Sequence, residues 1–205
     1  MSKRKEIYLI RHGETDYNLQ GIVQGRGVDM SLNETGRSQA ERFYKAYHHL
    51  RFDVVHTSEL KRSQETVASF IDKPIPHEAF QELDEISWGK YEGIKSSPDM
   101  KHEYKEMMSD WANGIYETKI EGGESPIDLQ ARQRDYLRIL EDHDAQKILI
   151  CSHGRAMRSL ICTMLEQELS KMSDYPHGNL SLYKFLWDGD SYEMTLFNNR
   201  DHLKY

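Results

Sequence analysis

The chain has 205 residues, of which 38% are hydrophobic and 30% charged, as expected for one globular domain with a substantial core. Its net charge of -7 argues against a nucleic-acid partner, because such partners are bound through a basic surface. The longest apolar runs are only strand-sized and the N-terminus leads straight into a charged strand, so we expect no membrane span. A cytoplasmic protein is therefore predicted, with Cys151 and Cys162 as buried thiols rather than a disulfide.

The N-terminal half of the chain alternates strand and helix patterns. A first strand is expected at Lys5–Ile10, and an amphipathic helix of about four turns follows the predicted N-cap residue Asn33. Phe52–Thr57 is typical of a second strand, and Ser58 is expected to cap the helix after it. Ile75–Ala79 is then a short third strand.

The C-terminal half is less regular at first and then regains the same alternation. We expect the segment 86–124 to be a cap-like insertion over the binding pocket, within a single domain that covers 1–205. The later elements are predicted as a helix within the insertion at Asp99–Asn113, a helix opened by Ser125-Pro126, a strand at Ile148–Ser152, a helix at Arg155–Glu166, and a hairpin of Leu180–Leu186 with Tyr192–Phe197.

Two histidines follow predicted strands, and each is itself followed by glycine. Arg11-His12-Gly13 comes directly after the first strand, and Ser152-His153-Gly154 closes the strand that begins at Ile148. Ligands of α/β sheets collect outside the carboxyl ends of the strands. We therefore expect both imidazoles to lie in one pocket at the same edge of the sheet.

A phosphate ester fits this arrangement of side chains. Arg11 and Arg62 can each bind phosphate oxygens in bidentate fashion, and His153, if protonated, adds a third cationic donor. His12 is then the nucleophile that attacks phosphorus. It must be neutral to do so, and the two neighbouring arginines disfavour its charged form.

The leaving alkoxide needs a proton, which one carboxylic acid can supply before it deprotonates a water. Asp84 and Glu85 are the candidates, and the apolar neighbours Ile86 and Trp88 would raise the affinity of Glu85 for a proton. Either residue is also compatible with a solvated surface acid. The residue pattern alone does not separate the two.

The segment Leu9–Asn18 resembles the signature of the histidine phosphatase superfamily, which contains phosphoglycerate mutases and many small phosphatases. The resemblance extends over nearly the whole chain. Further similar blocks are Gln24-Gly25, Ser31-Leu32, Gly36, Gln39-Ala40, Thr57–Arg62 with Thr66, Leu83, Glu85, Gly89, Glu92-Gly93, Ser152–Gly154, and Asn198 with His202-Leu203.

This resemblance implies a three-layer α/β/α sandwich with a mostly parallel central sheet and an antiparallel edge. It also implies an enzyme that needs neither a metal ion nor a cofactor. The implied roles are phosphate acceptor for His12, proton donor for Glu85, second catalytic histidine for His153, and phosphate pocket for Arg11, Arg62, Asn18, Gln24 and Gly154.

The superfamily divides by whether water or a second phosphoglycerate oxygen receives the phosphoryl group. Leu19–Gly25 resembles the phosphatase branch, and the arginines that mutases place in their cap are missing, since no arginine occurs between Arg62 and Arg132. We therefore expect a phosphatase acting on a small organic phosphate, with a phosphoglycerate mutase as the alternative. A broad phosphomonoesterase is the default, while sugar-phosphate, phosphoserine and cofactor-precursor phosphatases stay open.

Other classes of function agree less well with the sequence. A thiol phosphatase built on Cys151 fails on spacing, because its arginine would have to stand at Met157 and Arg158 is one residue too late. A metal site formed by His12, His56 and His153 is opposed by the two arginines. A non-catalytic phospholigand-binding module is a remote alternative, and the hairpin edge allows for a homodimer.

Overall fold

The computed structural model describes residues 4–71 and 74–204. Its strands are β1 (Lys5–Arg11), β2 (Val54–Thr57), β3 (His77–Ala79), β4 (Lys147–Ser152), β5 (Leu182–Trp187) and β6 (Tyr192–Asn199). They form one sheet in the order β3-β2-β4-β1-β5-β6. The first four strands in this order run parallel, while β5 is antiparallel to β1 and β6 is antiparallel to β5. The predicted parallel sheet with an antiparallel edge is confirmed.

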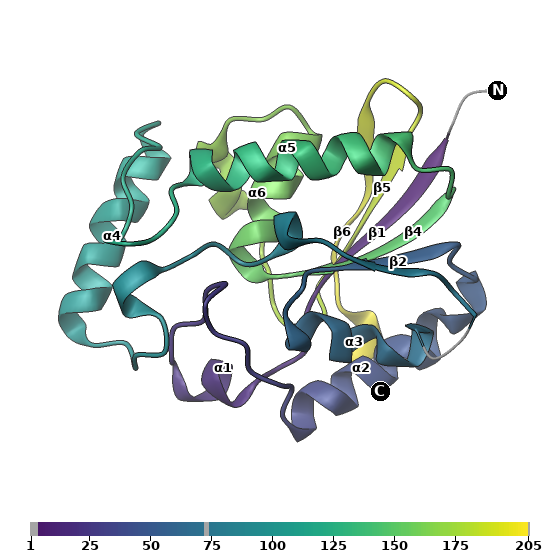
Figure 1. Ribbon diagram of the computed structural model, residues 1–205, viewed down its shortest axis with the longest axis horizontal. Helices are drawn as coiled ribbons and strands as arrows, with labels where there is room; N and C mark the ends of the chain where they lie inside the picture. Colours follow the sequence, from purple (N-terminus) through teal and green to yellow (C-terminus); the bar gives the residue numbers. More distant parts are fainter. Residues whose placement is uncertain (1–3, 72–73, 205) are drawn as a thin grey trace.

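Helices cover both faces of the sheet (Figure 1). Alternate residues of β1 supply the two cores: Ile7 and Leu9 join one apolar cluster, Tyr8 and Ile10 the other. The first cluster lies under α5 (Pro126–Asp142) and α6 (Gly154–Met164), and the second under α2 (Glu34–Tyr47) and α3 (Lys61–Ile71). This is the three-layer α/β/α sandwich that the sequence predicts.

The predicted helix caps are correct in two of three cases. The Asn33 side chain accepts the Gly36 N–H at 2.8 Å and begins α2. Ser125 begins α5 with a capping box in which Asp128 binds back to the Ser125 amide. The prediction for Ser58 was wrong, because α3 begins only at Lys61. The Ser58 hydroxyl is instead engaged with His153.

The segment 86–124 stands at one end of the sandwich, to the left in Figure 1. Its main element is α4 (Pro98–Ala112), whose buried residues Met107 and Trp111 belong to the cluster beneath α5 and α6. The shorter elements of the chain are α1 (Asp16–Gln20) and the 3-10 helices η1 (His48–Leu50), η2 (Gln81–Leu83), η3 (Gly89–Tyr91), η4 (Leu169–Asp174) and η5 (Asp201–Leu203).

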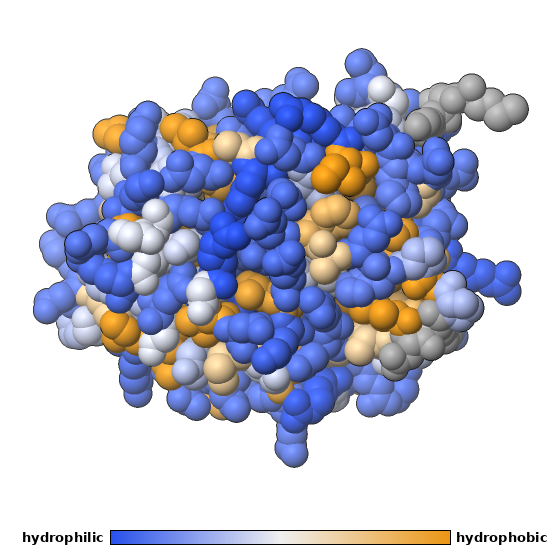
Figure 2. Space-filling view, viewed as in Figure 1, coloured by the Kyte–Doolittle hydropathy of each residue, from blue (hydrophilic) through white to orange (hydrophobic). Residues whose placement is uncertain are grey.

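The surface is mostly polar, as expected for a chain in which 30% of the residues are charged. The face in Figure 2 is mostly hydrophilic, with small apolar groups between the charged side chains. Among the described residues, none of the helices combines the length and the hydropathy that crossing a bilayer requires. Cys151 and Cys162 are buried free thiols, as expected.

Candidate active site

The two His-Gly pairs meet at the carboxyl edge of the sheet. Strands β1 and β4 are parallel neighbours with Arg11 opposite Ser152, and the His12 N–H donates to the Ser152 carbonyl at 3.0 Å. This register places His12 beside His153, with ring centroids 5.0 Å apart. Both rings are buried, at 3% and 0% exposure. The structure thus brings together the histidines that the sequence placed at two strand ends.

The hydrogen bonding of His12 leaves one ring nitrogen available as a nucleophile. Its Nδ1 lies 2.7 Å from the Gly13 carbonyl oxygen, which can only accept, so Nδ1 carries the proton. The lone pair is therefore on Nε2. Burial, followed by the charges of Arg11 and Arg62, holds the pKa of His12 well below its usual value. The ring is neutral at neutral pH, as a nucleophile requires.

His153 holds an arginine in place. Its Nδ1 accepts the Nε–H of Arg62 at 3.1 Å, so the ring proton is on Nε2, which donates to the Ser58 hydroxyl at 2.7 Å. Burial and then Arg62 keep the pKa of His153 well below its usual value. His153 was expected to add a third cationic donor only if it is protonated, and here its ring is neutral because Nδ1 accepts a hydrogen bond from Arg62 and therefore carries no proton.

The two arginines are held by backbone carbonyls. Arg62 is fully buried, and its other donors reach the carbonyls of Val28 at 2.5 Å and Gly25 at 3.2 Å. The Nη1 of Arg11 donates to the His177 carbonyl at 2.7 Å, while its Nε is buried without a partner among the described residues. Burial lowers the pKa of Arg11 to about 10, so it stays charged at neutral pH.

Glu85 lies at the N-terminus of α6, in a polar environment. Its Oε1 accepts the N–H groups of Ile86 at 2.9 Å and Ala156 at 2.8 Å, and its Oε2 accepts that of Arg155 at 3.0 Å. Of its apolar neighbours, Ile86 belongs to the core beneath α5 and α6 and Trp88 packs against it, and the carboxyl group itself is held by these three backbone donors. When ionised, Glu85 raises the pKa of both Arg11 and Arg62, against the lowering that burial causes.

The alternative acid, Asp84, is directed toward other residues. Its Oδ1 accepts the Glu59 N–H at 3.0 Å and its Oδ2 lies 3.6 Å from Arg26. Burial raises the pKa of Asp84 to about 6. The charge of Asp84 also raises the pKa of Arg62, but the carboxyl group that acts on both Arg62 and Arg11 is that of Glu85, which favours Glu85 over Asp84 as the candidate acid.

Asn18 and Gln24 are both anchored to Thr15. Asn18 completes the capping box of α1, in which its Oδ1 accepts the Thr15 N–H at 3.2 Å. Its Nδ2 has no hydrogen bond within the described ranges, so it can serve a ligand. The Gln24 side chain lies 2.9 Å from the Thr15 hydroxyl through Nε2. Nearby, a Cβ on Gly25 would lie 2.8 Å from the backbone carbonyl oxygen of Ile86 and would also displace the Glu92 carboxylate, so glycine fits best there.

The sequence analysis missed two residues of the loop before β5. A Cβ on Gly154 would lie 2.4 Å from the His177 ring, so Gly154 makes room for this third histidine. Burial lowers the pKa of His177 to about 3. Asn179 donates from Nδ2 to the His12 carbonyl at 2.9 Å. The one signal was a third His-Gly pair, His177-Gly178, which follows no strand.

Arg155 connects α6 to the segment 86–124. Its guanidinium donates to the Tyr104 hydroxyl at 2.6 Å and to the Met108 sulfur at 3.2 Å, and it lies 5.4 Å from the Trp111 ring centroid. The guanidinium of Arg155 therefore contacts the segment 86–124, although the sequence has no arginine between Arg62 and Arg132. The absence of arginines from the segment 86–124 was taken to favour a phosphatase over a mutase. The structure weakens that argument, because Arg155 supplies a guanidinium to this segment from α6.

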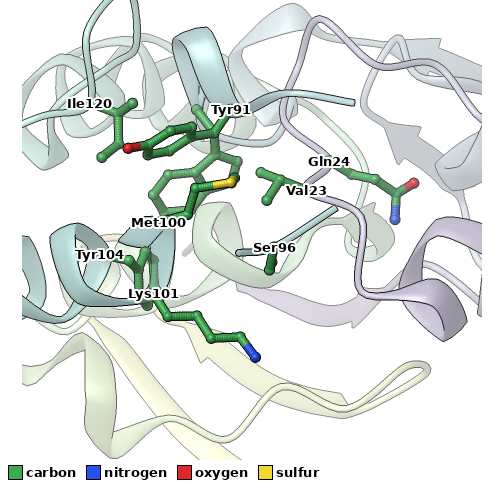
Figure 3. A pocket seen from close by; sticks show the side chains of 9 residues that line it. Val23, Gln24, Tyr91, Ser96, Met100, Lys101, Tyr104 and Ile120 are labelled. Carbon is green, nitrogen blue, oxygen red and sulfur yellow. The ribbon is translucent and has the colours of Figure 1, made fainter. Parts of the chain in front are cut away.

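A cavity of about 390 Å³ opens between this segment and the loop after α1. Its lining residues are Val23, Gln24, Trp88, Tyr91, Ser96, Met100, Lys101, Tyr104 and Ile120. Figure 3 shows Val23, Met100 and Ile120 around one space, with the polar ends of Gln24 and Lys101 directed outward. Two residues of the cavity lining are one hydrogen bond away from partners of the candidate site: Gln24 contacts Thr15, which binds Asn18, and Tyr104 contacts Arg155, which binds Glu85.

Comparison with known proteins identifies the family. The model of the histidine phosphatase superfamily (branch 1) matches residues 7–200. The chain belongs to the histidine phosphatase superfamily. Adenosylcobalamin/alpha-ribazole phosphatase of Escherichia coli is 31% identical over 78% of each chain. A 2,3-bisphosphoglycerate-dependent phosphoglycerate mutase of Bradyrhizobium sp. is 33% identical over 80% of this chain and 82% of its own.

A solved structure shows the same fold. The chain is similar to phosphoserine phosphatase from Entamoeba histolytica in complex with 3-phosphoglyceric acid, with a TM-score of 0.80 and 26% identity over 97% of this chain and 99% of that one. The relatives therefore include both phosphatases and mutases, and phosphatase activity on small phosphate esters agrees with this membership.

Proposed function

We propose that this protein is a phosphomonoesterase that hydrolyses a small organic phosphate through a phosphohistidine intermediate on His12, with no metal ion at that site. The observation that carries this proposal is the state of His12. Its ring is buried and neutral, its Nδ1–H is fixed by Gly13 so that the lone pair is on Nε2, and the charges of Arg11 and Arg62 act on it. Fixed cations around a neutral nucleophile are what phosphoryl transfer requires.

The reaction balances with the groups in place. The Nε2 lone pair of His12 attacks phosphorus, the ester P–O bond breaks, and Glu85 gives its proton to the leaving alkoxide. In the second step Glu85 takes a proton from water, whose oxygen attacks the phosphohistidine, and the P–N bond breaks. Inorganic phosphate leaves, with His12 neutral and Glu85 protonated once more.

Arg11 and Arg62 stabilise the charge on the equatorial oxygens, and the Asn18 Nδ2 and the Gln24 amide are additional donors. His153 acts mainly as a positioning residue, because it fixes the Nε of Arg62. Gly154 contributes space rather than a contact, since it admits His177 behind Arg11.

Water is the proposed acceptor of the phosphoryl group. Leu19–Gly25 has the phosphatase-like sequence, and part of it borders a largely apolar cavity. A cavity of about 390 Å³ suits an ester with an organic body larger than glycerate. Mutase activity is the second candidate, because Arg155 brings a guanidinium to the segment 86–124 and a mutase is among the relatives.

The segment 86–124 is the proposed cap, and the substrate class follows from it. Trp88, Tyr91 and Tyr104 offer aromatic surface to an organic group while the phosphate lies at His12. We propose a broad preference for phosphate esters with an apolar or aromatic body. The names of the relatives, which refer to alpha-ribazole and phosphoserine, lie within the range of esters to be tested.

The deciding experiment offers 3-phosphoglycerate with a trace of 2,3-bisphosphoglycerate and follows the 2-isomer and free phosphate together. A parallel panel contains phosphoserine, small alkyl phosphates and aryl phosphates. We expect phosphate release from the panel, fastest for aryl esters, and slower isomerisation. Protein carrying His12→Ala controls for contaminating phosphatases. Rapid isomerisation without phosphate release would overturn the proposal.

A further inference from the structure

A second histidine cluster lies apart from the phosphate site. His56 is on β2, Glu78 is its register partner on β3, and His143 is the C-cap residue of α5. Each of the three offers one metal-ligand atom, and these atoms lie within 4.8 Å of one another. The cluster shares no residue with the phosphate site.

His56 has an unused ligand atom. Its side chain is fully buried beside the rings of Phe80 and Tyr136. Its Nδ1 lies 2.9 Å from the Tyr136 hydroxyl, whereas its Nε2 is buried with no hydrogen-bond partner in residues 4–71 and 74–204. Burial lowers the pKa of His56 to about 3, so the ring is neutral. A buried polar atom without a partner is unfavourable, and a bound ion would satisfy it.

Glu78 and His143 already have the spacing of two zinc ligands. The Nε2 of His143 lies 3.4 Å from the Oε1 of Glu78. Ligands about 2.0–2.1 Å from a tetrahedral zinc ion are about 3.4 Å from each other. The side chain of His143 is 25% exposed and that of Glu78 is 43% exposed. Both can therefore move toward His56, and an ion can enter from solvent.

We propose that His56, Glu78 and His143 bind one divalent transition-metal ion of the zinc type, with water as the fourth ligand. Two imidazoles and one carboxylate suit zinc or cobalt better than magnesium or calcium. The bound ion would join the edge strand β3 to the end of α5, and would stabilise the fold without taking part in phosphoryl transfer.

Two neighbouring groups oppose tight binding. The Ala145 N–H donates to Nδ1 of His143 at 2.9 Å, and this hydrogen bond must be given up when Nε2 binds a metal ion, because the ring proton then moves to Nδ1. The ammonium of Lys5, held by the carbonyls of His143 and Ala145, lies near enough to lower the pKa of His56 and would repel a cation. We therefore expect micromolar rather than nanomolar affinity.

The test uses untagged full-length protein, treated with a chelator and titrated with Co²⁺ and then with Zn²⁺. We expect one ion per chain with a dissociation constant below about 50 μM. The visible absorption should be that of tetrahedral cobalt, and zinc should displace it and raise the melting temperature. Absence of binding at about 500 μM Co²⁺, or more than one equivalent site, would overturn the proposal.

Two variants of the proposed ligands and one control variant test where the ion binds. His143→Gln and Glu78→Gln should each weaken binding more than about tenfold and abolish the thermal shift. The matched control is His102→Gln, which removes a histidine that pairs at 3.5 Å with exposed Glu106 and that belongs to no group of three possible ligands within the described part of the chain. It should bind normally. Unchanged binding in the first two variants, or a loss in the control, contradicts the site. Turnover of all three should equal wild type, which separates this test from the one for phosphatase activity.

Discussion

The phosphate site and the cavity beside it differ in how their side chains are held. His12, His153 and Arg62 are almost fully buried, and each is fixed by backbone or side-chain partners at the carboxyl edge of the sheet. The cavity residues of the segment 86–124 differ in burial, from Ile120 at 2% exposed to Tyr104 at 38%. In the proposed function, the reacting groups are therefore placed by the sheet, whereas the groups that would contact the organic part of the substrate belong to the segment 86–124 at its end.

The largest expected effect comes from the nucleophile. His12→Ala should lower kcat by more than about 10³-fold and abolish phosphohistidine formation, because the ring nitrogens of His153, the imidazole beside His12, are both hydrogen-bonded, to Arg62 and Ser58. Labelling with a radioactive phosphate ester measures the intermediate. His49→Ala, which changes an exposed histidine, is the control and should label normally. Normal labelling of the His12→Ala variant would contradict the proposed mechanism.

The second effect depends on the leaving group. Glu85→Gln should slow hydrolysis of alkyl phosphates by about 10²-fold or more, and of activated aryl phosphates by less than about tenfold, because a good leaving group needs little protonation. Circular dichroism has to confirm that α6 is intact, since Gln cannot accept from all three backbone donors. Equal losses for both ester classes would show that Glu85 does not transfer the proton.

The third effect concerns Arg155, which lies between the proposed phosphate site and the cavity of the segment 86–124. Arg155→Met keeps an unbranched, though shorter, side chain and removes the guanidinium that donates to Tyr104. We expect KM for bulky esters to rise about tenfold while kcat changes less than about threefold. Arg134→Met, an exposed change on α5, is the matched control. A fall in kcat with unchanged KM would place Arg155 with the reacting groups instead.

The smallest effect concerns pH. Because the pKa of His12 is lowered, the neutral nucleophile persists below pH 6.5, and the rate of phosphohistidine formation should stay nearly constant from pH 7.5 to pH 6. An imidazole with an unperturbed pKa of about 6.5 would lose about fourfold over that range. Single-turnover measurements with an aryl phosphate distinguish the two. A fourfold loss would mean that burial and the arginines do not act on His12 as described.

The sequence was informative where local rules decide the structure. Strand ends, the Asn33 cap and the capping box of Ser125 follow from neighbouring residues, so the sheet edge with its two histidines was predictable. The protonation of His153 was not, because it depends on Arg62, which is 91 residues away in the sequence. That partner appears only in the folded chain.

The loop before β5 and the contacts of Arg155 were missed for a related reason. His177 and Asn179 reach the site from a segment without periodicity, positioned by tertiary contacts alone. Arg155 was expected to start a helix, and nothing in its neighbourhood indicated Tyr104 as a partner. The role of the segment 86–124 and the homodimer stay predictions.

Arg155, in the first turn of α6, limits which substitutions can be used to redesign the protein. The main chain of Arg155 holds the proposed proton donor through its N–H, while its side chain contacts the proposed cap. Proline at this position would remove the N–H and disturb proton transfer, whereas a different side chain with an intact N–H would leave it in place. A library for new substrate preferences can therefore vary this position widely, provided that proline is left out.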